Sequence, residues 1–204
     1  KNVLSIPALH PQNEAFIIPS HVNFVGADCA DVHFDAETIG ASLISARVLS
    51  LDYLWNNVRV LSGAYGCGFT RTAYGYSRFW SYRDPSIDTT LTTYAKSFEW
   101  LHAWDPTQSE LEGYIVSCTA SLDAPIKPYA QARRQDSEIL SHKPQNWQEM
   151  IRASQLTCTS KDIHDLATKW IDDAQNMNVC VFGSQESVDS SDVVFDKVIK
   201  LIDA

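Results

Sequence analysis

Apolar residues recur along this chain with two different periods, which predict strands and helices. Short runs rich in β-branched and aromatic residues, bounded by proline, glycine or serine, are typical of strands. Longer runs in which apolar residues return every three or four positions are typical of helices. The predicted strands are residues 15–18, 22–25, 64–70, 74–82 and 178–182. The predicted helices are residues 36–58, 85–102, 107–122, 129–141, 146–154, 161–174 and 192–202.

Capping signals support three of these helices. Asp84 and Pro85 have the form of an N-cap residue followed by a first-turn proline. Thr107 and Glu110 have the spacing of a capping box, in which two side chains satisfy the free N–H groups of the first turn. One residue of the pair 159–160 is expected to cap the helix that follows it.

The predicted strand 74–82 has an aromatic face. Tyr74, Tyr76 and Trp80 alternate with smaller residues, so their side chains are expected on one side of the sheet. That side either lines a wall that binds peptides or packs into the core. The pattern alone does not decide between them.

The order of the elements predicts an α+β fold, in which a mostly antiparallel sheet carries helices on one face. Hairpin-linked strands with several helices gathered between them favour this class. A βαβ nucleotide-binding fold is disfavoured, because no G-x-G-x-x-G or G-x-x-x-x-G-K-[ST] sequence is present. We expect residues 1–204 to form a single domain, with residues 1–13 as a lead-in arm that contains Pro7 and Pro11.

Charge narrows the range of partners. The formal net charge is -9 and the pI is near 5.0, whereas binding to nucleic acid depends on clustered lysine and arginine. An acidic interior would instead attract basic peptides. A membrane span needs about 20 consecutive apolar residues, and the sequence has no such run. We therefore predict neither nucleic acid nor membrane as a partner.

The cysteine pattern indicates reduced thiols. The five cysteines include no C-x-x-C pair, which favours an intracellular or organellar setting. The chain starts at Lys1 without an initiator methionine, so we interpret it as a mature fragment or an excised domain. The cysteines are Cys29, Cys67, Cys118, Cys158 and Cys180.

No metal site is predicted in this chain. A zinc peptidase needs closely spaced ligands such as H-x-x-E-H or H-E-x-x-H, and neither sequence occurs. His10 and Glu14 are one helical turn apart, but they fall in or beside the proline-containing arm, so we do not expect them to form a ligand pair. The six histidines have no repeated ligand spacing: His10, His21, His33, His102, His142 and His164.

A nucleophilic mechanism also has little support. The G-x-S-x-G elbow of serine hydrolases is absent. Cys67 is the one thiol in a glycine-rich loop, but no basic residue adjoins it in sequence to lower its pKa.

The stretch from Arg59 to Gly68 is the richest in chemistry. Gly63, Gly66 and Gly68 permit close approach of another backbone, while Arg59 and Tyr65 supply hydrogen-bond donors. Donors of this kind suit a peptide carbonyl that develops negative charge during acyl transfer. The structural alternative is that Tyr65 packs on the sheet and Arg59 caps the preceding helix.

Four segments together resemble a known family. Residues 59–68 read Arg-Val-Leu-Ser-Gly-Ala-Tyr-Gly-Cys-Gly, residues 81–85 read Ser-Tyr-Arg-Asp-Pro, and residues 122–125 read Leu-Asp-Ala-Pro. With Pro-Ser-His-Val-Asn-Phe-Val-Gly at 19–26, they resemble the C-terminal part of pitrilysin and insulinase-type zinc metallopeptidases, in particular the presequence protease and falcilysin branch. Order and spacing agree over residues 15–145.

The resemblance implies a division of labour. Enzymes of this family repeat an α+β module four times, as two bowl-like halves around a closed chamber. The first module carries the inverted zinc motif and its glutamate base, and the last contributes an arginine and a tyrosine to the same site. These residues correspond to Arg59 and Tyr65 as auxiliary catalytic residues, with Gly63, Ala64 and Gly66 as substrate-binding positions.

The same resemblance implies that this chain contains no metal and does not cleave peptides alone. Zinc is expected in the N-terminal catalytic half of the same polypeptide, which would be its partner together with a peptide substrate. The loop departs from the family pattern, because Val60, Leu61 and Ser62 replace Glu, Lys and Gly, and Cys67 replaces Gly. The alternative function is a structural or protein-binding module without a catalytic contribution.

Overall fold

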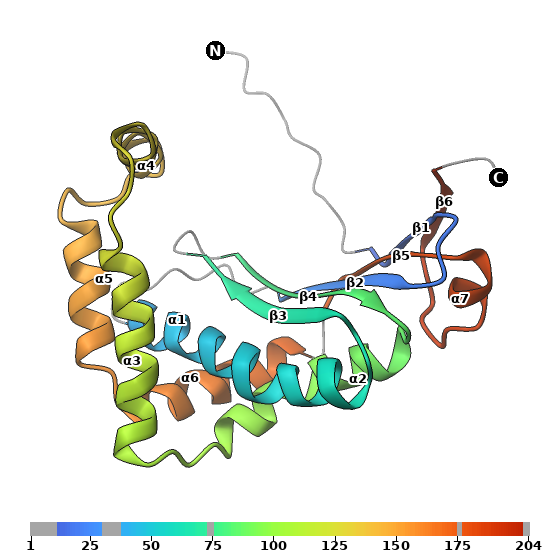
Figure 1. The fold of residues 1–204 in the computed structure, drawn as a ribbon, viewed down its shortest axis with the longest axis horizontal. Coiled ribbons are helices and arrows are strands. Elements are labelled where there is room, and N and C mark those ends of the chain that lie inside the picture. The colour runs from blue at the N-terminus through green and yellow to red at the C-terminus, as the bar shows by residue number, and fades with distance from the viewer. Residues whose placement is uncertain (1–11, 30–37, 73–75, 175–176, 202–204) are drawn as a thin grey trace.

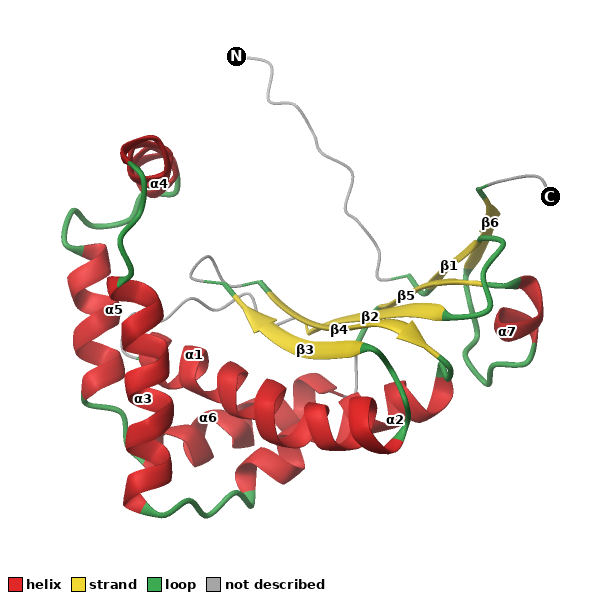
Figure 2. Cartoon of the chain, viewed as in Figure 1, coloured by secondary structure: helices red, strands yellow, loops and turns green. Residues whose placement is uncertain are grey.

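The fold is a single sheet covered by helices on one face (Figure 1; Figure 2). Of the 204 residues, a computed structural model describes residues 12–29, 38–72, 76–174 and 177–201. The predicted α+β class with helices on one face is confirmed. Among the described helices, none is long and apolar enough to cross a bilayer.

The sheet has six strands in the order β3-β4-β2-β5-β1-β6. Antiparallel pairing joins β3 to β4, β4 to β2 and β2 to β5, whereas β1 pairs in parallel with both β5 and β6. The prediction of a mostly antiparallel sheet is therefore confirmed. The strands are β1 Glu14–Ile17, β2 Asn23–Cys29, β3 Gly66–Arg71, β4 Ser77–Asp84, β5 Val179–Gly183 and β6 Lys197–Lys200.

The helices cover one face of this sheet. Helix α1 runs directly into η1, a π-helix, so the single long helix predicted from the sequence is present and ends a few residues later. Helices α2 and α6 lie against the same face, while α3 and α5 stand beside them and α4 projects from their end (Figure 1). The helices are α1 Ile39–Val48, η1 Leu49–Leu61, α2 Asp88–His102, α3 Gln108–Asp123, α4 Pro128–Leu140, α5 Trp147–Leu156, α6 Ser160–Asp173 and α7 Gln185–Asp189.

Aromatic side chains fill the layer between the sheet and the helices. The ring of Phe79 on β4 lies 4.5 Å from Phe69, 4.8 Å from Tyr94 and 5.5 Å from Phe98, measured between centroids. Trp170 of α6 closes the group at 5.2 Å from Phe98. Because strand residues alternate between faces, the burial of Phe79 turns its neighbours in β4 to the open face.

Local capping signals are confirmed at two helices. Thr107 and Glu110 form the predicted capping box at the start of α3. Thr159, one residue of the predicted pair, forms a second capping box with Asp162 at the start of α6. Each box satisfies two N–H groups that the first helical turn leaves without partners.

The predicted helix over residues 192–202 is wrong. The chain forms strand β6 there and pairs with β1, so that Lys197 lies opposite Glu14. A helix would bury its apolar stripe, but Val194 is 82% exposed and Val198 and Leu201 are each 50% exposed. Pairing with a strand from the other end of the sequence determines the structure of this segment. Strand β5 confirms the prediction for 178–182, but it is not the final strand.

The predicted N-cap at Asp84 is also wrong. Helix α2 begins at Asp88, and its N-cap residue is Ile87. Asp84 instead ends β4 with its side chain fully buried, where its carboxylate accepts hydrogen bonds from the hydroxyl groups of Ser81 at 2.6 Å and Thr90 at 2.8 Å. The carboxylate therefore ties β4 to the first turn of α2 without capping that helix.

Candidate functional site

The turn from η1 to β3 brings Arg59 and Tyr65 together. Arg59 lies in the last turn of η1, and its Nε donates a hydrogen bond to the main-chain oxygen of Tyr65 at 2.9 Å. The Cζ of Arg59 also lies 3.9 Å from the centroid of the Trp55 ring. The guanidinium is thus oriented by a planar stack and by one directed bond. Among the described residues, its Nη groups have no hydrogen-bond partner.

Glycine is required at the centre of this turn. Gly63 has φ +86°, a left-handed conformation that other residues adopt only with strain, and its N–H bonds to the Arg59 oxygen at 3.2 Å. The N–H of Ala64 bonds to the Val58 oxygen at 3.1 Å, and the Ala64 side chain is buried. These bonds end η1 and direct the chain into β3.

The side chain of Tyr65 remains accessible. The residue is 58% exposed, although its ring centroid lies 5.5 Å from that of Tyr82. On another side, the Cζ of Arg83 lies 5.5 Å from the Tyr65 ring centroid. Arg83 has a φ of 50°, so its backbone is in the left-handed region at the end of β4. The Tyr65 hydroxyl group is therefore available to a ligand.

A hollow of about 470 Å³ adjoins these residues. Guanidinium groups and a phenol surround it, so it can receive a carbonyl or carboxylate oxygen. It combines four predicted site residues, Arg59, Gly63, Ala64 and Tyr65, with Val22, Val60 and Arg83. The fifth predicted residue, Gly66, is not among those that line it.

Gly66 and Gly68 make room for aromatic rings of the same sheet. A Cβ on Gly66 would lie 2.3 Å from a ring carbon of Tyr82, and one on Gly68 would lie 2.7 Å from a ring carbon of Trp80. The indole Nε1 of Trp80 donates to the Thr70 hydroxyl at 3.0 Å and holds the ring over β3. The room that these two glycines leave, expected to admit another backbone, is occupied by side chains of the protein itself.

The aromatic face of β4 is not core. Trp80 is 36% exposed and lies on the face of β4 opposite the buried Phe79, and Tyr76, just before β4, is 74% exposed. Tyr74 lies outside the described residues. Of the two alternatives from sequence, the packed core is excluded for Tyr76 and Trp80, and the open face remains accessible to a ligand.

Cys67 is placed to stay protonated. The residue is 8% exposed, and its Sγ donates to the main-chain oxygen of Leu54 at 3.2 Å. Burial, together with the negative charge of Asp84, raises the pKa of the thiol to about 11. A thiol in this state is a poor nucleophile at neutral pH.

The described part of the chain holds no group of three or more His, Cys, Asp or Glu side chains that would bind a metal ion. His102 and His164 come closest to pairing, with ring centroids 6.0 Å apart, but His164 Nε2 bonds to the main-chain oxygen of Trp104 at 2.7 Å. His10 and His33 lie outside the described residues.

Sequence reasoning missed two residues that support the site. Trp55 precedes Arg59 by four positions, a spacing that places side chains on one helical face and therefore signals the stack. Arg83 contacts the Tyr65 ring and lines the hollow, although it was not among the predicted site residues. No local signal indicates that contact, because it depends on the pairing of β3 with β4.

Comparison with known proteins places these features in a family context. A family model described as the PreP C-terminal domain matches residues 13–184. Presequence protease 1, chloroplastic/mitochondrial, of Arabidopsis thaliana is 30% identical over 187 residues, which are 88% of this chain and 17% of that protein. The chain spans about a fifth or less of the length of the curated relatives that it matches.

Solved structures share the fold at low sequence identity. The peptidase M16 inactive domain from Pseudomonas fluorescens has a TM-score of 0.65 and 16% identity, covering 86% of this chain and 44% of that one. A putative zinc protease from Bordetella pertussis Tohama I has a TM-score of 0.64 and 16% identity, covering 81% of this chain and 96% of that one. At these identities the likeness concerns the fold alone.

Proposed function

Because the chain belongs to the PreP C-terminal domain family, we propose that it completes the peptide-cleaving site of a pitrilysin-type zinc metallopeptidase. In this proposal, residues 1–204 are one domain that binds no zinc, and the N-terminal half of the same polypeptide holds the metal. Zinc there would activate the attacking water. The present chain would supply donors to the peptide and part of the chamber wall.

The observation that carries the proposal is the pairing of Arg59 with Tyr65 beside an open hollow. Arg59 Nε fixes the main-chain oxygen of Tyr65 at 2.9 Å, while 58% of Tyr65 remains exposed. The Tyr65 hydroxyl would donate to the scissile carbonyl oxygen as it gains negative charge. Arg59 would hold the tyrosine in position and direct its Nη groups to the same region. Gly63 and Ala64 would place the turn against the peptide, with Gly66 beginning the strand behind it.

The first test replaces Tyr65 by phenylalanine in the polypeptide that carries both halves. Removing one donor to a developing oxyanion is expected to lower kcat by about ten-fold or more, with the ring and its packing preserved. Tyr76→Phe is the matched control, because Tyr76 is 74% exposed and lies outside the hollow. Peptide cleavage by both variants is the measurement. Equal rates for Tyr65→Phe and the unmodified protein would exclude the proposed role.

The second test addresses the division of labour. The 204-residue chain alone is expected to show no peptide cleavage, and cleavage is expected to return when it is mixed with the zinc-binding half. Association is measured in parallel by size-exclusion chromatography with light scattering. A stable complex that does not cleave peptides would count against the proposal.

A structural role is the second candidate, and one observation favours it. Val60 and Leu61 are 61% and 77% exposed beside the hollow, an arrangement suited to contact with another protein surface. In that case Leu61→Ser would weaken association of the two halves, whereas Tyr65→Phe would leave both association and turnover unchanged.

A further inference from the structure

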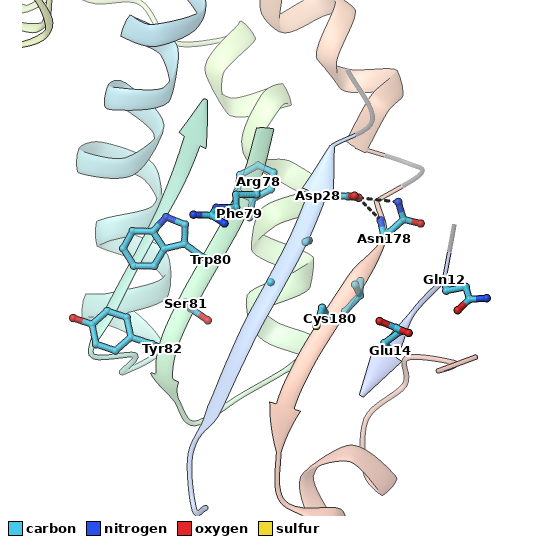
Figure 3. Close-up of a pocket in the computed structure, with 13 residues that line it drawn as sticks. Gln12, Glu14, Asp28, Arg78, Phe79, Trp80, Ser81, Tyr82, Asn178 and Cys180 are labelled. Carbon is cyan, nitrogen blue, oxygen red and sulfur yellow. Dashed lines mark hydrogen bonds between the residues drawn. The ribbon is translucent and has the colours of Figure 1, made fainter. Parts of the chain in front are cut away.

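The open face of the sheet carries a second hollow, of about 610 Å³ (Figure 3). It shares no lining residue with the hollow at the Arg59 turn, although Tyr82 at its edge contacts the Tyr65 ring. It extends from Trp80 and Tyr82 on β4, across β2 and β5, to Glu14 on β1. Gly26 lies in its floor, opposite Trp80 in the register with β4 and opposite Cys180 in the register with β5.

Packing does not require glycine at position 26. A Cβ there would meet the main-chain oxygens of Cys180 at 3.5 Å and Phe79 at 3.9 Å, which are ordinary contact distances. At Gly66 and Gly183, by contrast, a Cβ would lie 2.3 Å from the nearest atom. The φ of Gly26 is outside the left-handed region, so the backbone does not require glycine either. Glycine weakens a central strand because it has no side chain to pack. At position 26, the missing side chain leaves the floor of the hollow open.

The walls of the hollow differ in chemistry. On the β4 side, the Trp80 ring leans over Gly68 and away from Gly26, so the indole borders the hollow without filling it. On the β1 side stands the carboxylate of Glu14, which is 3.7 Å from Lys197 Nζ in a solvent-exposed pair. The space between the two walls is floored by Gly26 and Cys180.

The residues that line the hollow carry one more negative charge than positive charge, while Lys197, outside the lining, is paired with Glu14. Glu14 and Asp28 are negative, and Arg78 is the one cationic residue among those that line it. Asp28 is fixed in place, because its Oδ1 accepts bonds from the Asn178 N–H at 3.0 Å and Nδ2 at 2.8 Å. Burial and the Glu14 charge raise the pKa of the Cys180 thiol, so the floor itself is neutral.

We propose that this hollow is a subsite for one lysine or arginine side chain of a peptide bound along the open face of the sheet. The aliphatic stem would lie over Gly26 and Cys180, beside the Trp80 ring, and the cation would face Glu14. A glutamate at the same peptide position would meet the carboxylates of Glu14 and Asp28. The inference rests on the proposed function for its peptide ligand, but it concerns a different part of the sheet.

The test is an NMR titration of the ¹⁵N-labelled 204-residue chain. The probe is a nine-residue peptide with lysine, norleucine or glutamate at its centre. Its other residues are the uncharged residues alanine, serine and glutamine. Lysine is expected to bind about two- to five-fold more tightly than norleucine, because its cation gains a modest energy beside the partly exposed carboxylate of Glu14, whereas the Trp80 ring contacts only the stem that both side chains share. The amides of Gly26 and Cys180 and the Trp80 indole are expected to shift. Equal affinity for lysine and norleucine would overturn the proposal.

Two variants test the geometry. Gly26→Val fills the floor and is expected to abolish the shifts at Cys180 and Trp80, while its unfolding temperature stays at or above that of the unmodified chain. Gly113→Ala is the control, because a Cβ at Gly113 meets nothing within 4 Å on helix α3. Glu14→Gln is expected to remove the preference for lysine over norleucine. Unchanged lysine binding by a folded Gly26→Val chain would exclude the subsite.

The two proposals fail in different experiments. Lysine binding at Gly26 without recovery of cleavage on mixing with the zinc-binding half would reject the proposed function and retain the subsite. Recovery of cleavage with unaltered peptide binding by Gly26→Val would reject the subsite and retain the proposed function.

Discussion

At the scale of single residues, Arg59 has two tasks that need different atoms. Its Nε bonds to the Tyr65 main chain, and its planar group stacks on Trp55. Lysine would keep the charge but lose the directed bond and the planar stack. A loss of activity in an Arg59 variant would therefore combine a missing charge with a displaced Tyr65. This is why Tyr65→Phe, which alters one hydroxyl group, is the cleaner test of the site.

The thiol of Cys67 predicts a pH dependence of stability. Its pKa is raised to about 11 in the folded chain, above the value of 9.0 for an unperturbed thiol. Between these values the unfolded chain has lost the proton and the folded chain retains it. The contribution of this thiol to the free energy of unfolding is therefore fully present below pH 9, and it is lost as the pH rises from 9 to 11. Burial raises the pKa of Cys158 to about 12 and acts in the same direction.

Urea unfolding at pH 8, 9, 10 and 11 checks this dependence. Cys67→Ala is expected to lose stability less steeply over the same range, because one of the perturbed thiols is gone. Identical slopes for the two chains would show that Cys67 does not contribute. At pH 8 the thiol is protonated in both the folded and the unfolded chain, so the difference in free energy of unfolding between Cys67→Ala and the unmodified chain gives the packing cost of the substitution. This difference is subtracted from the values at the other pH values.

At the scale of elements, the buried carboxylate of Asp84 joins β4 to α2. It accepts bonds from the hydroxyl groups of Ser81 and Thr90 and from the N–H of Ser86. Asp84→Ala removes the shared acceptor and leaves these buried donors unsatisfied. We expect the free energy of unfolding to fall by about 3 kcal/mol.

The matched control is Asp105→Ala, since Asp105 is exposed between α2 and α3. A change within about 0.5 kcal/mol is expected there, as for most surface substitutions. Chemical denaturation of the three chains at neutral pH gives the comparison. A similar small change at Asp84 would mean that the two hydroxyl groups find other acceptors.

Local signals predicted some elements well and others poorly. The capping boxes at Thr107 and Thr159 depend on residues three positions apart, so the sequence was sufficient to place them. The segment that forms β6 has apolar spacing compatible with a helix, and its strand state depends on pairing with β1. Long-range pairing of this kind is not encoded in the segment itself.

The candidate site was also predictable only where its residues lie close together in sequence. Arg59 and Tyr65 lie six positions apart across one turn, and the structure places them in contact. The hollow over Gly26 was not predicted, because it depends on four strands whose order follows from the whole sheet. The sequence also does not distinguish the reasons for which glycine is present. A side chain at Gly66 would clash with the Tyr82 ring, whereas a Cβ at Gly26 would make only ordinary contacts.

At the scale of the whole molecule, the chain is expected to bind no zinc with stoichiometric occupancy. No metal-binding group of three or more His, Cys, Asp or Glu side chains exists among the described residues, and the ligands are proposed to lie in the other half. Elemental analysis of the purified 204-residue chain after dialysis against zinc gives the measurement. One tightly held zinc per chain would overturn the division of labour proposed for the two halves.

The position of β1 has a consequence for how the molecule is made. This strand lies between β5 and β6, and contacts at its start join residues 166 and 183 positions apart in sequence. During synthesis, β1 has neither neighbour until the segments that form β5 and β6 have followed it. Closing such long loops slows folding and leaves the strand exposed in the meantime. The sheet is therefore expected to be completed only after translation of β6, and until then the edge groups of β1 lack their strand partners.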